Sequence, residues 1–215
     1  TARGRGYQYI AVTDHVGSLK IANAMDEKRI KEQAKEIESI NKQYEREGVD
    51  FHVLRGAEVN IRADGRLDMP DSVLKDLDIV LASIHTGFQD EVEKITSRFK
   101  GALENQNVDV IAHPTGRLIL ERAGYKIDLR ELIQGALDTG TVLEIDGYPN
   151  RLDLSDENAF DAIKSGCILC VDTDAHNTSE LEYMEIGVAQ ARRARAEPKN
   201  ILNTKTYDEL SEFLG

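Results

Sequence analysis

The sequence predicts an α/β fold in which a mainly parallel sheet or barrel is covered by crossover helices. Short apolar runs alternate with longer segments of helical periodicity, and this alternation is typical of βα units. The chain has 215 residues, 40% of them apolar, which is enough for one large core. No Gly/Ser/Pro-rich linker, internal repeat or low-complexity tract divides the sequence. We therefore expect a single domain over residues 1–215.

The predicted strands are six short apolar runs bounded by polar or turn residues. The pairs Asp64-Gly65 and Met69-Pro70, which are typical of turns, follow the second run. The six runs are Tyr9–Val12, Phe51–Val59, Ile79–Ile84, Val108–Ala112, Val142–Ile145 and Ile168–Val171.

The predicted helices lie between these strands. Several begin with Asp or Ser, whose side chains accept hydrogen bonds from the free backbone N–H groups of a first helical turn. The alternating charges of the first helix indicate a solvated outer face rather than a nucleic-acid-binding stripe. The segments are Asp26–Glu47, Asp90–Asn105, Asp128–Thr139, Ser155–Lys164 and Ser179–Arg193.

Composition restricts the partners and the place of action. With a net charge of −12, the chain alone should bind DNA weakly, because non-specific binding to a phosphate backbone needs clustered Lys and Arg. No run of about 18 apolar residues and no signal-peptide stretch occur, so we expect a cytoplasmic protein. Cys167 and Cys170 are interpreted as core residues, because side chains three apart on a strand point to opposite faces and do not grip one metal.

Polar residues follow nearly every predicted strand. TDH, SIH, HPTGR, DGYP and DTDAH come directly after strands, and the second strand itself contains GAEVN. In α/β barrels the carboxyl ends of the strands converge on one mouth, where the functional groups lie. We therefore expect six side chains to face one another there, namely His15, Glu58, His85, His113, Asp174 and His176.

This combination of side chains predicts a multinuclear metal site. Imidazole and carboxylate ligands together suit Zn, Mn or Fe, and a carboxylate bridges two cations about 3.5–4 Å apart. A lone histidine at a strand end is more commonly a hydrogen-bonded structural group, but four of the five histidines occupy such positions. His52, at the opposite end of the second strand, is interpreted as structural.

The ordered series TDH, GAEVN, SIH, AHP and DAH resembles the motifs of the PHP (polymerase and histidinol phosphatase) superfamily over nearly the whole chain. More narrowly, AHPTGRLILER, EIDGYPNRLDLSD and VDTDAHNTSELEYMEIGVAQARRA are similar to the C-terminal PHP domain of bacterial and archaeal family X DNA polymerases. The resemblance implies a distorted (βα)7 barrel that holds up to three divalent ions, Zn²⁺ and/or Mn²⁺, in its mouth.

The resemblance also implies how the ligands are divided among the metals. One metal takes the strand glutamate and the histidines of SIH and AHP, which are Glu58, His85 and His113. A second keeps only Glu58 and Asp174, and a third keeps only His15 and His176. The family's H-x-H strand has no counterpart in the sequence. We expect that first strand to lie upstream, so that fewer metals bind here than in an intact domain.

The resemblance implies phosphoester hydrolysis by metal-activated water. Glu58, His113 and Asp174 would act through the metals. Arg117 would clamp the substrate phosphate with Arg151 assisting, although a surface ion pair is the competing interpretation for each arginine. In a family X polymerase the domain would be a manganese-favoured 3′–5′ exonuclease that also acts at damaged DNA ends, with DNA held by an upstream polymerase module.

Two other functions stay open at the level of the sequence. One is a free-standing phosphatase acting on histidinol phosphate or a nucleotide, and the other is a noncatalytic domain whose metals brace a polymerase. The absent strand would also leave an open seam in the barrel. Because unpaired strand edges favour association, the hypothesis that follows is a homodimer across that seam.

Overall fold

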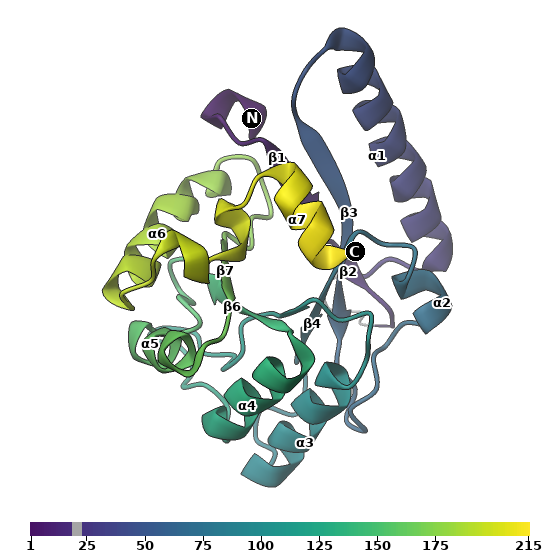
Figure 1. The fold of residues 1–215 in the computed structure, drawn as a ribbon. Helices are drawn as coiled ribbons and strands as arrows, with labels where there is room; N and C mark the ends of the chain where they lie inside the picture. The colour runs from purple at the N-terminus through teal and green to yellow at the C-terminus, as the bar shows by residue number, and fades with distance from the viewer. Residues whose placement is uncertain (19–22) are drawn as a thin grey trace.

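A curled parallel sheet is the centre of the computed structural model, which describes residues 1–18 and 23–215. The strand order is β1-β3-β4-β5-β6-β7, and β2 also pairs with β3. The paired strands are parallel throughout. Helices surround the outer face of the sheet, which curls into a half-barrel (Figure 1). The predicted α/β class and distorted barrel are confirmed.

The strands follow the predicted apolar runs, with several ends shortened. One addition is a two-residue strand, β2, which pairs His15 with Glu58 and Val16 with Val59. This register places a predicted ligand histidine directly beside the predicted strand glutamate. The strands are β1 (Tyr9–Val12), β2 (His15–Val16), β3 (His52–Asn60), β4 (Ile79–Ser83), β5 (Val110–Ile111), β6 (Val142–Asp146) and β7 (Leu169–Asp172).

The long helices also follow the predicted segments, and Asp26, Asp128 and Ser155 cap three of them through their side chains. These helices are α1 (Glu27–Glu47), α3 (Val92–Leu103), α4 (Leu129–Thr139) and α5 (Asp156–Ser165). The last predicted helix is divided into η3 (Glu180–Tyr183) and α6 (Met184–Arg193). Elements outside the prediction are η1 (Arg3–Arg5), α2 (Asp71–Leu74), η4 (Pro198–Asn200), η5 (Leu202–Thr204) and α7 (Tyr207–Leu214). Within the described residues, no helix has both the length and the apolar character that a membrane crossing requires.

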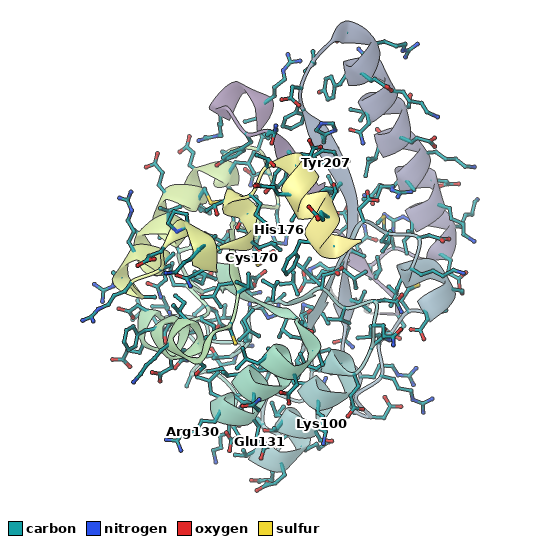
Figure 2. The ribbon with its side chains drawn as sticks, in the orientation of Figure 1. Lys100, Arg130, Glu131, Cys170, His176 and Tyr207 are labelled. Atoms are coloured by element: carbon teal, nitrogen blue, oxygen red, sulfur yellow. The ribbon has the colours of Figure 1, made fainter. Side chains whose placement is uncertain are left out.

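Helix α7 lies across the opening between β1 and β7 (Figure 1). The Tyr207 backbone N–H donates to the side chain of Gln8, and the Tyr9 hydroxyl donates to the Lys205 carbonyl at 2.9 Å. The Tyr207 ring, labelled in Figure 2, stacks on His52 with 3.6 Å between ring centroids. His52 therefore serves the packing of α7, at the end of β3 remote from Glu58.

The free edge of β7 is covered by the segment that precedes α7. The Asn203 side chain accepts the Val171 N–H at 3.0 Å and donates to the Val171 carbonyl at 2.6 Å. Ile201 forms a parallel bridge with Leu169. A side-chain amide thus supplies the hydrogen bonds that a further strand would make. The expected open seam is partly filled from within the chain, and the expected homodimer gains no specific support.

Two apolar clusters line the two faces of the sheet. Cys167 belongs to the larger cluster between the sheet and its helices, whereas Cys170 belongs to the cluster that faces Leu202 and Leu210 inside the half-barrel. Both cysteines are free and buried. The interpretation of this pair as core residues on opposite faces is confirmed.

Arg98 of α3 anchors the loops that follow β3 and β4. Its side chain is fully enclosed at 1% exposure. The guanidinium donates to the carbonyls of Arg62 at 3.0 Å, Thr86 at 2.7 Å and Ile61. Because a buried guanidinium without acceptors would be strongly destabilising, these three carbonyls fix both loops relative to α3.

Asp109 gives the fold a stability that depends on pH. Its carboxylate accepts the Val80 N–H at 2.8 Å, and burial raises its pKa from 3.8 to about 6. The folded state therefore binds the proton more tightly than the unfolded state. The resulting stabilisation is complete below the unfolded pKa and is lost as the pH rises through about 6.

We expect Asp109→Asn to remove this part of the pH dependence and to increase the unfolding free energy by about 1–3 kcal/mol near neutral pH. Urea unfolding followed across a pH series measures the effect. Asp161→Asn, at an exposed position of α5, is the control and should keep the parent's pH profile. Parallel profiles for Asp109→Asn and the parent would show that the buried carboxyl has no such role.

Candidate metal centre

Three histidines contact one buried carboxylate at the carboxyl ends of neighbouring strands. Glu58 of β3 is only 7% exposed. The distances from its carboxylate oxygens are 3.3 Å to His15 Nδ1, 3.3 Å to His85 Nε2 and 2.9 Å to His113 Nε2. The ring centroids of His15 and His85 are 5.0 Å apart, and those of His85 and His113 are 5.4 Å apart.

The parallel connections explain why residues so distant in sequence meet here. His85 and His113 each lie two residues beyond the last residue of β4 and β5, respectively. His15 is in register with Glu58 through β2. The backbone of His113 has a φ of 30°, in the left-handed region that non-glycine residues rarely adopt. Such strained backbone is concentrated at functional sites.

Hydrogen bonds orient the histidines around Glu58. The fully buried Ser83 places its Oγ 3.2 Å from His85 Nδ1, which leaves Nε2 facing Glu58. The Asn60 side chain accepts the backbone N–H of His85. Glu144 accepts the backbone N–H of His113. The Ser83 contact fixes the direction of the His85 ring, and the other two hydrogen bonds hold the backbone of His85 and His113.

Electrostatics favours the protonation states that a metal requires. Burial alone would raise the pKa of Glu58, but hydrogen bonds from His113 and His85 and the charges of nearby imidazoles hold that pKa well below its usual range. Burial lowers the pKa of His85, although Glu58 acts in the opposite direction. An anionic carboxylate and a neutral imidazole are the ligand forms that bind divalent cations.

The donor set fits a divalent cation. In the described part of the chain, His15, Glu58 and His85 form a group whose ligand atoms all lie within 4.8 Å of one another. The buried Nδ1 atoms of His15 and His113 have no hydrogen-bond partner among the described residues. His15 Nδ1 lies 3.3 Å from Glu58 Oε2, but the two atoms do not form a hydrogen bond. Nitrogen and oxygen donors arranged in this way suit Zn²⁺, Mn²⁺ or Fe²⁺.

Asp174 and His176 lie at the rim, apart from the group around Glu58. Asp174, with a φ of 43°, has Oδ2 3.4 Å from Arg151 Nε. His176, labelled in Figure 2, is exposed, and its Nδ1 lies 2.7 Å from the Asp174 carbonyl. The His15 and His176 rings are 6.4 Å apart. The rim residues thus approach the centre on the side of His15.

The two arginines expected to bind phosphate have different surroundings. Arg117 donates from Nε to the Arg151 carbonyl at 2.8 Å and from Nη2 to the Leu152 carbonyl. Arg151 extends to the mouth, where its Nε lies 3.3 Å from Asp146 and 3.4 Å from Asp174. Arg117 holds the loop, and Arg151 is the guanidinium beside the rim carboxylates.

Buried carboxyl groups on β6 and β7 were not among the predicted site residues. Burial raises the pKa of Glu144 well above its usual range, with Asp172 and Asp146 adding to the shift. Burial and neighbouring acids also raise the pKa of Asp146 to about 9 and that of Asp172 to about 6. The signal was present as acidic residues inside the apolar strands VLEID and LCVD. Asp146 begins DGYP and Asp172 begins DTDAH, two of the strand-end motifs, whereas Glu144 lies within an apolar strand.

No protein-family profile matches the chain. Over 210 residues it is 46% identical to the "DNA polymerase/3'-5' exonuclease PolX" of Bacillus subtilis, covering 98% of this chain and 36% of that protein. It is 32% identical over 178 residues to a probable phosphatase of Thermoanaerobacter sp., covering 78% of this chain and 69% of that protein. A probable phosphatase of Caldanaerobacter subterraneus is 28% identical over 181 residues.

The chain is an α/β protein with a parallel half-barrel and a site built on strand ends, where histidines and carboxylates gather at the mouth. The chain belongs to the PHP superfamily and is similar to the PHP domain of bacterial family X DNA polymerases. It spans little more than a third of the length of the Bacillus relative.

Ser83→Ala is expected to weaken divalent-metal binding by about 10–100-fold, because His85 loses the contact that orients its ring. Titration of Mn²⁺ or Zn²⁺ against a competing chromophoric chelator measures the affinity. Ser165→Ala, at an exposed position of α5, is the matched control and should bind metal like the parent. Unchanged affinity in a folded Ser83→Ala variant would exclude this role for the hydroxyl.

Proposed function

We propose that the chain is one phosphoesterase domain whose activity depends on divalent metal ions. It would work as the 3′–5′ exonuclease module of a family X DNA polymerase in DNA repair. The observation that carries the proposal is the meeting of three histidines on the buried carboxylate of Glu58. The relative that is 46% identical over almost the whole chain is named as a polymerase and 3′–5′ exonuclease, which supports the choice of substrate.

Zn²⁺ or Mn²⁺ is the proposed cofactor. Glu58, His85 and His113 would hold one ion together with His15, and Asp174 and His176 would contribute to a further one. Bound cations of this kind lower the pKa of a coordinated water and stabilise charge on phosphoryl oxygens. Burial of Glu58 opposes its ionisation, but hydrogen bonds from His113 and His85 lower its pKa and favour the anionic form that binds a cation.

The arginines take separate roles in this proposal. Arg151 would orient the substrate phosphate, because its guanidinium is partly exposed beside Asp174. Arg117 would act on the substrate indirectly, by holding the backbone of residues 151 and 152. In the reaction, a water oxygen bonds to phosphorus and the bond to the preceding 3′ oxygen breaks. That oxygen takes a proton, and a nucleoside 5′-monophosphate is released.

DNA binding would depend mainly on other parts of a longer protein. The net charge of −12 makes the chain itself a weak partner for a phosphate backbone. The proposed place of action is the cytoplasm, where the two cysteines would persist as free thiols.

A phosphatase that acts on small phosphate esters is the second candidate. It is favoured by the relatives named as probable phosphatases, one of which is matched over 69% of its length. The two candidate functions share the metal centre and differ in the substrate, which is DNA for the exonuclease and a small phosphate ester for the phosphatase. Substrate preference therefore decides between them.

His85→Asn is expected to lower Mn²⁺-dependent hydrolysis of a single-stranded oligonucleotide by more than about 100-fold. Loss of a residue that only orients a metal ligand lowers activity by about 10–100-fold, and loss of the ligand itself should lower it further. The protein encoded by the complete gene is assayed by release of labelled 5′-mononucleotide. A chelator should abolish the activity, and added Mn²⁺ should restore it.

His52→Asn is the matched control, since His52 lies at the far end of the same strand as Glu58 and packs on Tyr207. It should keep nearly the parent rate. Equal rates for His85→Asn and the parent would disprove a catalytic metal centre. Hydrolysis of small phosphate monoesters alone would support the phosphatase instead.

A further inference from the structure

Leu120 combines two features that stability does not explain. Its side chain is completely exposed, at 103% relative accessibility. Its φ is 66°, in the left-handed region that disfavours a leucine and that Gly or Asn adopts readily. An exposed polar residue or glycine would remove both disadvantages. A strained backbone at an exposed apolar side chain motivates a functional hypothesis for this position.

The surrounding segment, residues 117–124, is a braced hairpin, named here the 117–124 hairpin. Leu118 and Arg122 exchange both backbone hydrogen bonds, at 2.9 and 2.8 Å. The Arg122 guanidinium lies 3.9 Å from the centroid of the Phe88 ring and donates to the Gly116 carbonyl at 2.8 Å. The position of Leu120 at the tip is thus built into the fold.

The hairpin is joined to the rim of the candidate metal centre. It begins four residues after His113. The Ile119 N–H donates to the Asn150 carbonyl, and Arg117 donates to the Arg151 carbonyl. The side chain of Arg151 reaches to within 3.4 Å of Asp174. Hairpin and rim loop therefore form one hydrogen-bonded unit, which joins the segment of Leu120 to the loop of Arg151.

We propose that Leu120 is a substrate-contacting residue that packs on a nucleobase of single-stranded DNA near the scissile phosphate, which rests on the proposed exonuclease function. Every base has an apolar face, and proteins use apolar side chains against bases or between them without reading their sequence. The leucine side chain has no hydrogen-bonding atom, and the partly exposed Ile119 beside it extends the apolar tip. Arg117 and Arg122 flank the tip but bind backbone carbonyls. Because Glu121 is exposed beside Leu120, the proposed contact rests on apolar packing rather than on charge.

Leu120→Asn is the informative variant, because Asn tolerates the left-handed backbone and the fold is retained. We expect its KM for a single-stranded oligonucleotide to rise by about 10-fold or more, with kcat within about 2-fold of the parent. Hydrolysis of bis(p-nitrophenyl) phosphate, which has no base, should be unchanged. Leu120→Met should restore the parent KM, and Leu137→Asn, on α4, is the control.

A binding measurement separates this inference from the proposed function. Oligonucleotides with 2-aminopurine at the 3′ end are titrated with the complete gene product in Ca²⁺, and fluorescence reports base contact without turnover. Loss of the signal change in Leu120→Asn supports the contact even if no hydrolysis occurs, in which case only the exonuclease function fails. Equal oligonucleotide KM and equal fluorescence for Leu120→Asn and the parent overturn the contact. If Leu120→Asn binds DNA like the parent but is cleaved more readily by a protease between domains, Leu120 contacts another part of the protein. That result also overturns the base contact.

Discussion

The buried negative charge of Glu58 is the constraint around which the site is organised. A carboxylate removed from water is strongly destabilising unless it is paired and hydrogen-bonded. The imidazoles of His85 and His113 supply hydrogen bonds to it, and the His15 ring approaches it to 3.3 Å from a third segment. Because parallel strands end at the same edge, the half-barrel brings these side chains together without long excursions of the chain.

Arginines that bind backbone carbonyls give the rim its rigidity. Arg98 joins the loops after β3 and β4 to α3, and Arg117 joins the segment after β5 to the loop that carries Arg151. Guanidinium groups suit this work because they present several donors in a fixed plane. A site held by such contacts keeps its geometry within the small tolerance that catalysis requires. The same bracing joins the hairpin of the exposed Leu120 to the loop of Arg151.

The carboxyl-terminal segment completes the half-barrel from the opposite end. Asn203 satisfies the edge of β7, and Leu210 of α7 packs inside the sheet against residues of several strands. Metal ligands and α7 therefore occupy opposite ends of the sheet interior. Stacking of His52 on Tyr207 shows how one strand, β3, serves both, with a packing histidine at its start and Glu58 near its end.

The sequence alone determined the α/β class, the main strands and helices, and the strand-end histidines that meet on Glu58, because period and capping are local properties and parallel connections force a common edge. Only the tertiary structure decided which ring nitrogens face Glu58, that Arg117 binds carbonyls, and that Arg98 is buried. It also decided the docking of α7 and the clustering of Glu144 with Asp172. These features arise from contacts between residues far apart in the chain, and no local pattern distinguishes a buried arginine on a helix from a solvated one.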